Sequence, residues 1–252
     1  MVKFMNNGYL WGCAMEFKAL FFDLDGTLIN FNEGDFVKLY LGAAAKFFSD
    51  LIPNPKTFVE ELLKSTEIME KADNPETTTL EVFVNDFCPK FEIDCQTIMD
   101  RFEDFYHKKF NVIQPIIKQM NGVKEILSIL KESYSDIPVL LTTNPVFPYI
   151  AVKKRMEWGG LTTADFDHIT HAENSYYCKG NDKYWYNALE YSKTKPESTL
   201  VVGNDAFRDL RSKKLGFKTY LVDENIENEE SLNENIPDYR GSLVDLLALL
   251  KT

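Results

Sequence analysis

Two aspartates spaced two positions apart are the residues of this sequence best suited to chemistry. Asp23 and Asp25 follow the apolar run ALFF at positions 19–22, and Gly26 and Thr27 come directly after them. The run is short, β-prone and bounded by a turn signal, which predicts a buried strand. Gly26 permits a sharp turn, and Thr27 can hydrogen-bond within the loop. Because ligands bind beyond the carboxyl ends of strands in open α/β sheets, we expect a nucleophile, a proton carrier and a hard-cation site here.

The segment FDLDGT resembles the first motif of the haloacid dehalogenase-like (HAD) hydrolase superfamily, Asp-x-Asp-Gly-Thr after a strand. The resemblance implies that Asp23 attacks a phosphoryl group and that Asp25 is the general acid and base. It also implies that Asp25 binds the metal through its backbone carbonyl and that Gly26 and Thr27 help to bind substrate. An Asp-Gly pair alone is also an ordinary turn, so the later motifs decide. Dehalogenating members of the superfamily lack the second aspartate, and Asp25 therefore favours phosphate chemistry.

A second motif of the family is a Thr or Ser after an apolar strand, often followed by Asn. The segment LLTTN at 140–144 fits this pattern. Thr143 is the match because Asn144 follows it, and Thr142 is the alternative. A hydroxyl at this place can hydrogen-bond a phosphoryl oxygen without adding charge. We therefore expect Thr143 in catalysis and substrate binding, with Asn144 beside it.

A third motif of the family is a Lys upstream of a helix, which neutralises the nucleophile and the phosphate. Lys179 precedes a helical pattern at the expected spacing, although the family's common Lys-Pro pair is replaced by Lys179-Gly180. Lys183 is the alternative, and an ordinary surface lysine is the plainer interpretation. The resemblance implies that Lys179 is both catalytic and substrate-binding.

The fourth motif of the family is Gly-Asp followed by a second Asp four or five residues later. Here Asn204 follows Gly203 directly, which departs from the commonest form, and the acidic pair becomes Asp205 and Asp209. We expect Asp205 to be a direct ligand of Mg²⁺ and Asp209 to be a second acid or an orienter of the motif's lysine. Alone, these residues would be an Asp-rich helix start stabilised by the helix dipole. The predicted metal-binding residues are Asp23, Asp25, Asp205 and Asp209.

The elements that must position these motifs differ between two parts of the chain. From residue 35 to about 110 apolar residues repeat at helical spacing, with Asp35 and Asp94 as helix starts and Pro53 and Pro55 as a stop. Helices inserted in an α/β frame predict a second small domain, in which the aromatic residues form a core. The position matches the family's usual cap. We predict a helical cap domain at 32–114, an α/β core domain at 1–31 and 115–252, and an N-terminal extension at 1–14.

From residue 121 strands and helices alternate, which predicts a doubly wound, Rossmann-like α/β fold with a parallel sheet covered on both faces. The expected strands are 138–142, 166–170, 199–202 and 218–222, in addition to 19–22. The expected helices are 122–131, 148–158, 181–191, 206–215 and 241–250.

Composition excludes several classes of protein. The chain has 252 residues, 44% of them hydrophobic, and a net charge of -11. This is enough apolar material for a core, and the acidic balance without basic clusters argues against nucleic acid or an anionic membrane as partner. No apolar stretch approaches the length of a membrane span, and the N-terminus is a poor signal peptide, so we expect a cytoplasmic protein. Cys88 and Cys95 are too far apart for a zinc knuckle. In a cytosolic protein we expect Cys13, Cys88, Cys95 and Cys178 to be reduced, buried thiols.

The four motifs in order predict a Mg²⁺-dependent phosphomonoester hydrolase. We expect it to act on a small phosphorylated metabolite through an aspartyl-phosphate at Asp23. A sugar phosphomutase of the same family is the alternative, and a non-catalytic binding protein with this fold is a second. The sequence favours no other catalytic class, because its three histidines stand in no triad or metal-ligand spacing. It identifies neither the substrate nor the oligomeric state.

Overall fold

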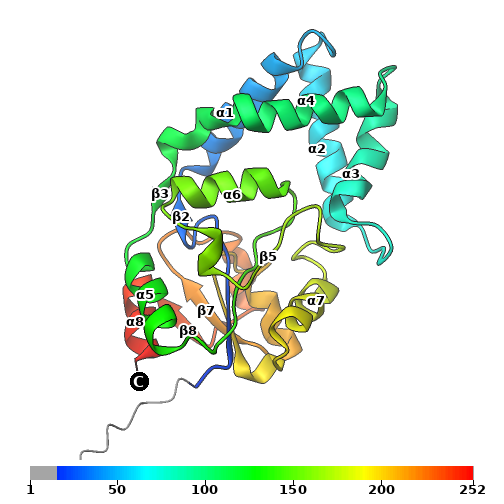
Figure 1. Cartoon of the computed structure of the whole chain (residues 1–252). Coiled ribbons are helices and arrows are strands. Elements are labelled where there is room, and N and C mark those ends of the chain that lie inside the picture. Colours follow the sequence, from blue (N-terminus) through cyan, green and yellow to red (C-terminus); the bar gives the residue numbers. More distant parts are fainter. Residues whose placement is uncertain (1–15, 252) are drawn as a thin grey trace, which may run out of the picture.

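The computed structural model describes residues 16–251, so the predicted extension at 1–14, with Cys13, lies outside the described residues. The core is a six-stranded sheet in the order β5-β4-β1-β6-β7-β8, in which every neighbouring pair is parallel (Figure 1). The predicted α/β fold with a doubly wound parallel sheet is therefore confirmed. The strands of this sheet are β1 (Ala19–Phe22), β4 (Val139–Leu141), β5 (His168–Ile169), β6 (Thr199–Gly203), β7 (Lys218–Val222) and β8 (Tyr239–Gly241).

Both faces of the sheet are covered, as the alternation along β1 shows. Leu20 and Phe22 belong to a large core cluster that includes residues of α5 (Val123–Ser133), α6 (Tyr149–Trp158) and α8 (Leu243–Leu250). Ala19 and Phe21 belong to a second cluster with residues of α7 (Asp182–Ser192). Successive strand residues point to opposite faces, so one continuous apolar run supplies both cores.

Four helices are inserted between β2 (Ile29–Asn30) and β3 (Lys118–Gln119), which pair with each other in antiparallel orientation. They lie above the sheet in Figure 1, beyond the carboxyl ends of its strands. Their aromatic residues pack on one another, as expected: Phe48 and Phe102 have ring centroids 4.5 Å apart, and Phe58, Phe87 and Phe105 are fully buried. The inserted helices are α1 (Glu33–Phe47), α2 (Pro55–Lys71), α3 (Thr79–Phe87) and α4 (Cys95–Lys108).

The starts of the inserted helices follow from local chemistry. Asn32, not Asp35, caps α1, because its side chain accepts a hydrogen bond from the backbone N–H of Asp35. Pro55 is the first residue of α2, where its missing N–H costs nothing, so it begins a helix rather than stopping one. Asp94 caps α4 as expected.

Two further expectations are wrong. Residues 206–215 do not form an α-helix: a turn is followed by a 3₁₀ helix at Leu210–Leu215. The Asp205 carboxylate binds the N–H groups of Phe207 and Arg208 and so holds the turn. Cys88 and Cys95 are not reduced thiols but form a disulfide, because the reversal between a 3₁₀ helix at Cys88–Lys90 and α4 brings their Cα atoms within 5.2 Å.

The other connecting 3₁₀ helices are Phe110–Ile116, Thr163–Asp165, Pro196–Ser198 and Glu229–Asn233. Among the helices of the described residues, none is long and apolar enough to cross a membrane.

Candidate active site

A cavity of ≈ 610 Å³ lies between the carboxyl ends of the strands and the inserted helices. Its floor and its roof differ in chemistry. We call the polar residues in the loops that follow β1, β4 and β6, and in the loop that precedes α7, the floor. We call the apolar residues of α1 and α2 the roof. The floor comprises Asp23, Asp25, Thr143, Asn144, Lys179, Asp205 and Asp209. The roof comprises Phe36, Val37, Tyr40, Leu41, Leu62 and Leu63.

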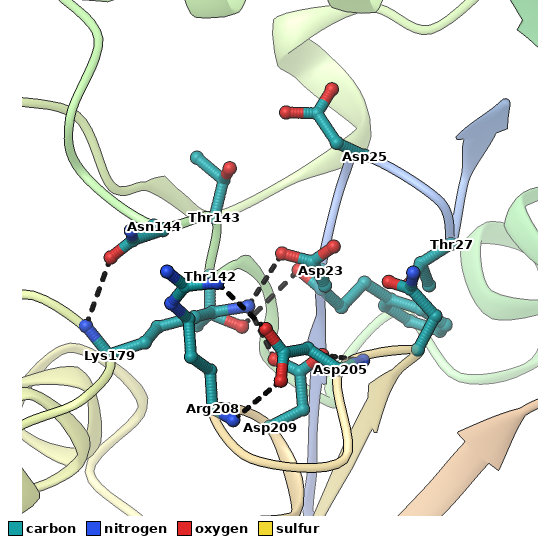
Figure 2. Close-up of polar contacts among 12 residues, drawn as sticks. Asp23, Asp25, Thr27, Thr142, Thr143, Asn144, Lys179, Asp205, Arg208 and Asp209 are labelled. Atoms are coloured by element: carbon teal, nitrogen blue, oxygen red, sulfur yellow. Dashed lines mark hydrogen bonds and ion pairs between the residues drawn. The ribbon is translucent and has the colours of Figure 1, made fainter. Parts of the chain in front are cut away.

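A buried lysine between two carboxylates is the centre of the floor. Lys179 Nζ lies 2.5 Å from Asp23 Oδ1 and 2.5 Å from Asp209 Oδ1, and the Lys179 side chain is 2% exposed (Figure 2). Lys183 instead lies outside the site, where its ammonium pairs with Asp73 at 2.7 Å. The structure therefore places Lys179, the first choice from the sequence, beside the predicted nucleophile.

Burial and charge act against each other in this cluster. Burial alone opposes a charged lysine, but the carboxylates of Asp209 and Asp23 raise the pKa of Lys179 above its ordinary value. Burial raises the pKa of Asp23 and of Asp209 above the usual range, and the Lys179 ammonium works in the opposite direction. The ammonium is therefore the group that favours the anionic form of Asp23, the predicted nucleophile.

The second motif separates into a structural and a cavity-lining threonine. Thr142 is fully buried, and its hydroxyl donates to the carbonyl of Phe22 at 3.2 Å. Thr143 lines the cavity, and its carbonyl accepts hydrogen bonds from Thr170 and Tyr184. The motif's preferred threonine is thus the one that lines the cavity.

Asn144 ties three parts of the chain together. Its Oδ1 accepts the backbone N–H of Lys179 at 3.1 Å, and its Nδ2 donates to Glu70 of α2 at 2.8 Å. It therefore lines the cavity while fixing both the lysine loop and an inserted helix.

The loop after β1 is held by Asn204 of the fourth motif. Gly26 has φ +78°, and a Cβ there would lie 2.2 Å from Asn204 Nδ2, so only glycine fits. Thr27 is fully buried and donates to Asn204 Oδ1 at 3.1 Å. Gly26 lines the cavity, whereas the structure places Thr27 behind it, in a supporting position.

The two acids of the fourth motif have different surroundings. Asp209 has both carboxylate oxygens engaged, Oδ1 by Lys179 and Oδ2 by the backbone N–H of Asp205 at 3.0 Å. Asp205 lines the cavity and binds the Arg208 guanidinium through Oδ2 at 2.9 Å. Burial would raise the pKa of Asp205, but hydrogen bonds from Arg208 and Asn228 hold it below the usual range. Of the two roles considered for Asp209, its contacts favour orientation of Lys179.

The comparison with protein families decides the assignment. The family described as haloacid dehalogenase-like hydrolase matches residues 17–214. The chain belongs to the haloacid dehalogenase-like hydrolase family. The resemblance seen in the four motifs is thereby confirmed, and with it the class of hydrolase.

Relatives of this HAD-like hydrolase span nearly its whole length. A protein of Caldanaerobacter subterraneus, provisionally named pyrophosphatase PpaX, is 26% identical over 241 residues, which cover 94% of either chain. CbbY from Rhodobacter sphaeroides, solved in complex with phosphate, has a TM-score of 0.59 at 17% identity over 94% of this chain and 100% of its own. A predicted phosphoglycolate phosphatase from Haemophilus somnus has a TM-score of 0.57 at 17% identity over 93% and 98% of the two chains. The two solved structures share the fold.

The donors on the cavity floor of this HAD-like hydrolase fit a magnesium ion. Asp23 and Asp205 both line the cavity, and Asp25 Oδ1 is a buried oxygen without a hydrogen-bond partner among the described residues. Carboxylate and carbonyl oxygens are the ligands that Mg²⁺ prefers. No group of three acidic, His or Cys side chains converges on one point within residues 16–251, and Asp209 is taken up by Lys179. The cavity thus offers separate carboxylates, those of Asp23, Asp205 and Glu227, rather than a closed cage, as suits an ion that retains waters.

Several residues of the site were missed from the sequence. Arg155 of α6 forms an ion pair with Asp25, and Glu70 of α2 accepts hydrogen bonds from Arg208 and Asn144. Glu227 also lines the cavity, and burial with the nearby acidic groups raises its pKa to about 7. Arg155 could have been found, because it falls on the same helical face as buried apolar residues. The other two depend on contacts between distant segments.

Proposed function

We propose that the chain is a Mg²⁺-dependent phosphomonoester hydrolase that acts on a small phosphorylated metabolite through an aspartyl-phosphate at Asp23. The observation that carries this proposal is the pair of contacts at 2.5 Å that join Lys179 to Asp23 and Asp209 on the floor of the cavity. A carboxylate held this way beside a cation can attack an anionic phosphoryl group. The family assignment supports the same chemistry.

The reaction balances with residues of this chain. An oxygen of Asp23 attacks phosphorus, and the bond from phosphorus to the ester oxygen breaks. The electron pair goes to the leaving oxygen, which takes a proton from Asp25. Asp25 then takes a proton from the water that attacks the aspartyl-phosphate, and this releases inorganic phosphate and restores Asp23. Lys179, Thr143 and the Asn144 region would hold the phosphoryl oxygens during both steps.

The metal would be held by Asp23, Asp205 and the backbone carbonyl of Asp25. When bound, Mg²⁺ supplies positive charge that reduces the repulsion between an anionic nucleophile and an anionic phosphate. Asp209 would act on the same site indirectly, by fixing Lys179. Asp205 reaches the metal only if its carboxylate is shared with Arg208 or released by it.

The inserted helices at 32–114 would serve as a cap over the α/β core formed by the remaining residues. Roof residues of α1 and α2 line the same cavity as the floor, which supports a role in excluding water and selecting the leaving group. A cavity of ≈ 610 Å³ suits a small phosphorylated substrate.

A phosphoric anhydride is a second candidate substrate, favoured by the name pyrophosphatase PpaX of the relatives that match along nearly the whole chain. The same nucleophile and acid would serve, because an anhydride also leaves as an oxyanion. A sugar phosphomutase is the remaining alternative, since it would keep the phosphoryl group and release no steady phosphate.

The deciding experiment measures phosphate release from p-nitrophenyl phosphate, simple phosphate esters and pyrophosphate, with Mg²⁺ and with a chelator. We expect metal-dependent turnover, lowered on the order of 10⁴-fold or more in Asp23→Asn. Asp104→Asn is the matched control, because this aspartate is exposed, pairs with Lys108 in the next helical turn and does not line the cavity. Turnover that survives Asp23→Asn would contradict the proposed nucleophile. Phosphoryl transfer between sugar phosphates without net release would favour the mutase.

A further inference from the structure

A second cavity, of ≈ 360 Å³, adjoins the cavity of the candidate active site. We call it the side cavity. It is lined by residues of the inserted helices and by residues of the loops that follow β4 and β5. Its volume lies within the range of ligand pockets, which form preferentially where separately packed parts of a protein meet. The mechanism proposed above uses only the first cavity, so the side cavity has no role in it.

Two segments of the chain run along both cavities. The loop after β4 begins on the floor at Thr143, borders both cavities at Val146 and reaches the side cavity at Pro148. Helix α2 likewise borders both cavities, at Leu62 and Thr66. The two cavities are therefore neighbouring parts of one hollow between the sheet and the inserted helices.

A pair of tyrosines lies where the cavities meet. Tyr40 lines both cavities and Tyr106 lines the side cavity, and their hydroxyls form a hydrogen bond of 3.1 Å. Both side chains are buried, and this burial raises the pKa of both hydroxyls, so they remain uncharged at neutral pH. The tyrosine pair therefore presents rings and uncharged hydroxyls to a ligand that extends from one cavity into the other.

The interior of the side cavity is apolar. Met69, Phe83 and Phe102 are buried residues of its lining, and the rings of the two phenylalanines have centroids 5.9 Å apart. Leu80 of α3 and Met99 of α4 are half-buried members of the same lining. Hydrocarbon that moves from water into such surroundings gains free energy in proportion to the apolar area that is covered. The side cavity is thus suited to the apolar part of a ligand.

The exposed edge of the side cavity is acidic. The carboxylates of Asp100, Glu103 and Glu173 lie there with the imidazole of His107. No lysine or arginine of the described residues lines the side cavity, whereas three line the first cavity: Arg155, Lys179 and Arg208. Opposite charges attract and like charges repel, so a phosphoryl group is directed to the first cavity and an anionic group is disfavoured in the second.

We propose that the side cavity receives the leaving group of the substrate, which is then a phosphate monoester of an apolar alcohol without negative charge at its far end. This inference rests on the proposed function and deepens it, because it names the class of substrate. The phosphoryl group stays on the floor, and the hydrocarbon extends past Tyr40 and Val146 into the side cavity.

The first test varies only the length of the leaving group. The n-alkyl phosphates from ethyl to octyl all release a primary alcohol, so their intrinsic reactivity is nearly the same. For the wild type with Mg²⁺, we expect kcat/KM to rise about 3-fold per added methylene and on the order of 10²-fold over the series. Phosphate release is measured at concentrations below those at which the esters form micelles.

The second test fills the side cavity. Leu80→Trp enlarges a side chain that lines the side cavity but not the first one. We expect kcat/KM to fall about 10–30-fold for octyl phosphate and to stay within about 3-fold for ethyl phosphate. Leu127→Trp is the matched control, because Leu127 is also a half-buried helical leucine but lines neither cavity. It should leave the ratio of the two rates unchanged.

The third test varies the charge at the far end of the substrate. Aminohexyl phosphate and carboxypentyl phosphate have chains of equal length that end in an amine and a carboxylate. At low ionic strength we expect the wild type to prefer the amine about 10-fold, and Glu103→Lys to reduce this preference about 3–5-fold. Asp104→Lys is the matched control, since Asp104 is an exposed acid of the same helix that lines neither cavity.

Each contrary result is distinct. Equal kcat/KM for ethyl and octyl phosphate in the wild type, or a preference for the carboxylate, would overturn the inference. If the same turnover is lost in Asp23→Asn, the proposed function stands. A Leu80→Trp loss shared equally by the two esters would also overturn the inference. Should that variant not fold, the wild-type series and the exposed Glu103→Lys decide.

Turnover of pyrophosphate alone would likewise overturn the inference, because pyrophosphate has no hydrocarbon to enter the side cavity. A wild type that releases no phosphate from any of these substrates would instead refute the proposed function, and the inference with it. Turnover that is insensitive to Asp23→Asn would do the same.

Discussion

The floor and the roof of the cavity are held together by different forces. On the floor, Asp23, Lys179 and Asp209 are buried and bonded to one another, and the carboxylate of Asp205 is bound by Arg208 and Asn228. On the roof, Val37 is 41% exposed and Leu63 is 51% exposed, and both offer only apolar surface. A buried polar network has one good geometry, whereas apolar side chains tolerate exchange. The floor can therefore hold the reacting groups in one geometry, whereas the side chains of the roof can be replaced to suit different substrates.

Glu70 is a point where the two regions meet. It belongs to α2, yet its Oε1 accepts hydrogen bonds from Asn144 at 2.8 Å and from Arg208 at 3.1 Å. The roof is thereby tied to the loop that carries Lys179 and to the acid expected at the metal. These hydrogen bonds therefore fix the position of α2 relative to the residues of the cavity floor.

The largest expected effect comes from breaking the floor. Lys179→Met removes the charge shared by Asp23 and Asp209 and leaves two buried carboxylates facing each other. We expect kcat to fall on the order of 10³-fold and the free energy of unfolding to fall by about 3–5 kcal/mol. Steady-state kinetics and denaturant unfolding measure the two. Lys183→Met, which removes an exposed pair with Asp73, should change stability by less than about 1 kcal/mol. A Lys179→Met enzyme with native activity would contradict the importance given to the floor.

A change on the roof should act on binding instead. Leu63→Asn alters an exposed lining residue, so we expect KM for p-nitrophenyl phosphate to rise about 3–10-fold with kcat within about 3-fold. Stability should change by less than about 0.5 kcal/mol, because Leu63 is half exposed. Ile68→Asn is the matched control, since Ile68 lies on the same helix, is 45% exposed and is not part of the cavity lining. A fall in kcat larger than the rise in KM would erase the distinction between roof and floor.

The smallest effect on activity is expected at β5, an edge strand of the sheet, away from the cavity. His168 stacks on Tyr191 with ring centroids 3.5 Å apart, and burial, helped by His171, lowers its pKa to about 4. Because the folded value lies below the unfolded one, the unfolded state binds the proton more readily. Stability from His168 is therefore present at neutral pH and is lost as the pH falls from about 6.5 towards 4.

With allowance for solvent screening, we expect this loss to be about 1–2 kcal/mol. Unfolding midpoints measured between pH 7.5 and 4.5 should show it in the wild type and a smaller drop in His168→Gln. Activity at neutral pH should be the same in both proteins. Identical pH profiles of stability would show that His168 does not contribute.

Much of this fold can be predicted from local sequence patterns. The strands expected at 199–202 and 218–222 are found at Thr199–Gly203 and Lys218–Val222, because buried parallel strands are continuous apolar runs that periodicity reveals. Asp23 and Lys179, named from motifs, meet on the floor because the end of β1 and the loop between β5 and α7 both lie at the carboxyl edge of the sheet.

What was missed depends on contacts that no local pattern encodes. β2, β3 and β8 have two or three residues each and are partly exposed, so they carry no alternation to detect. Arg155 meets Asp25 across 130 positions of sequence. The expectation of reduced thiols rests on a cytosolic compartment, whereas the disulfide between Cys88 and Cys95 depends on a chain reversal that the sequence does not reveal.

The antiparallel pair of β2 and β3 has a consequence for the ancestry of the chain. Ile29 pairs with Gln119 and Asn30 with Lys118, so the backbone leaves the sheet and returns to it at neighbouring points. None of the six strands of the parallel sheet lies in the segment between β2 and β3. The segment between β2 and β3 can therefore be replaced, lengthened or shortened as a unit during evolution. Substrate preference can then change while the α/β core stays the same.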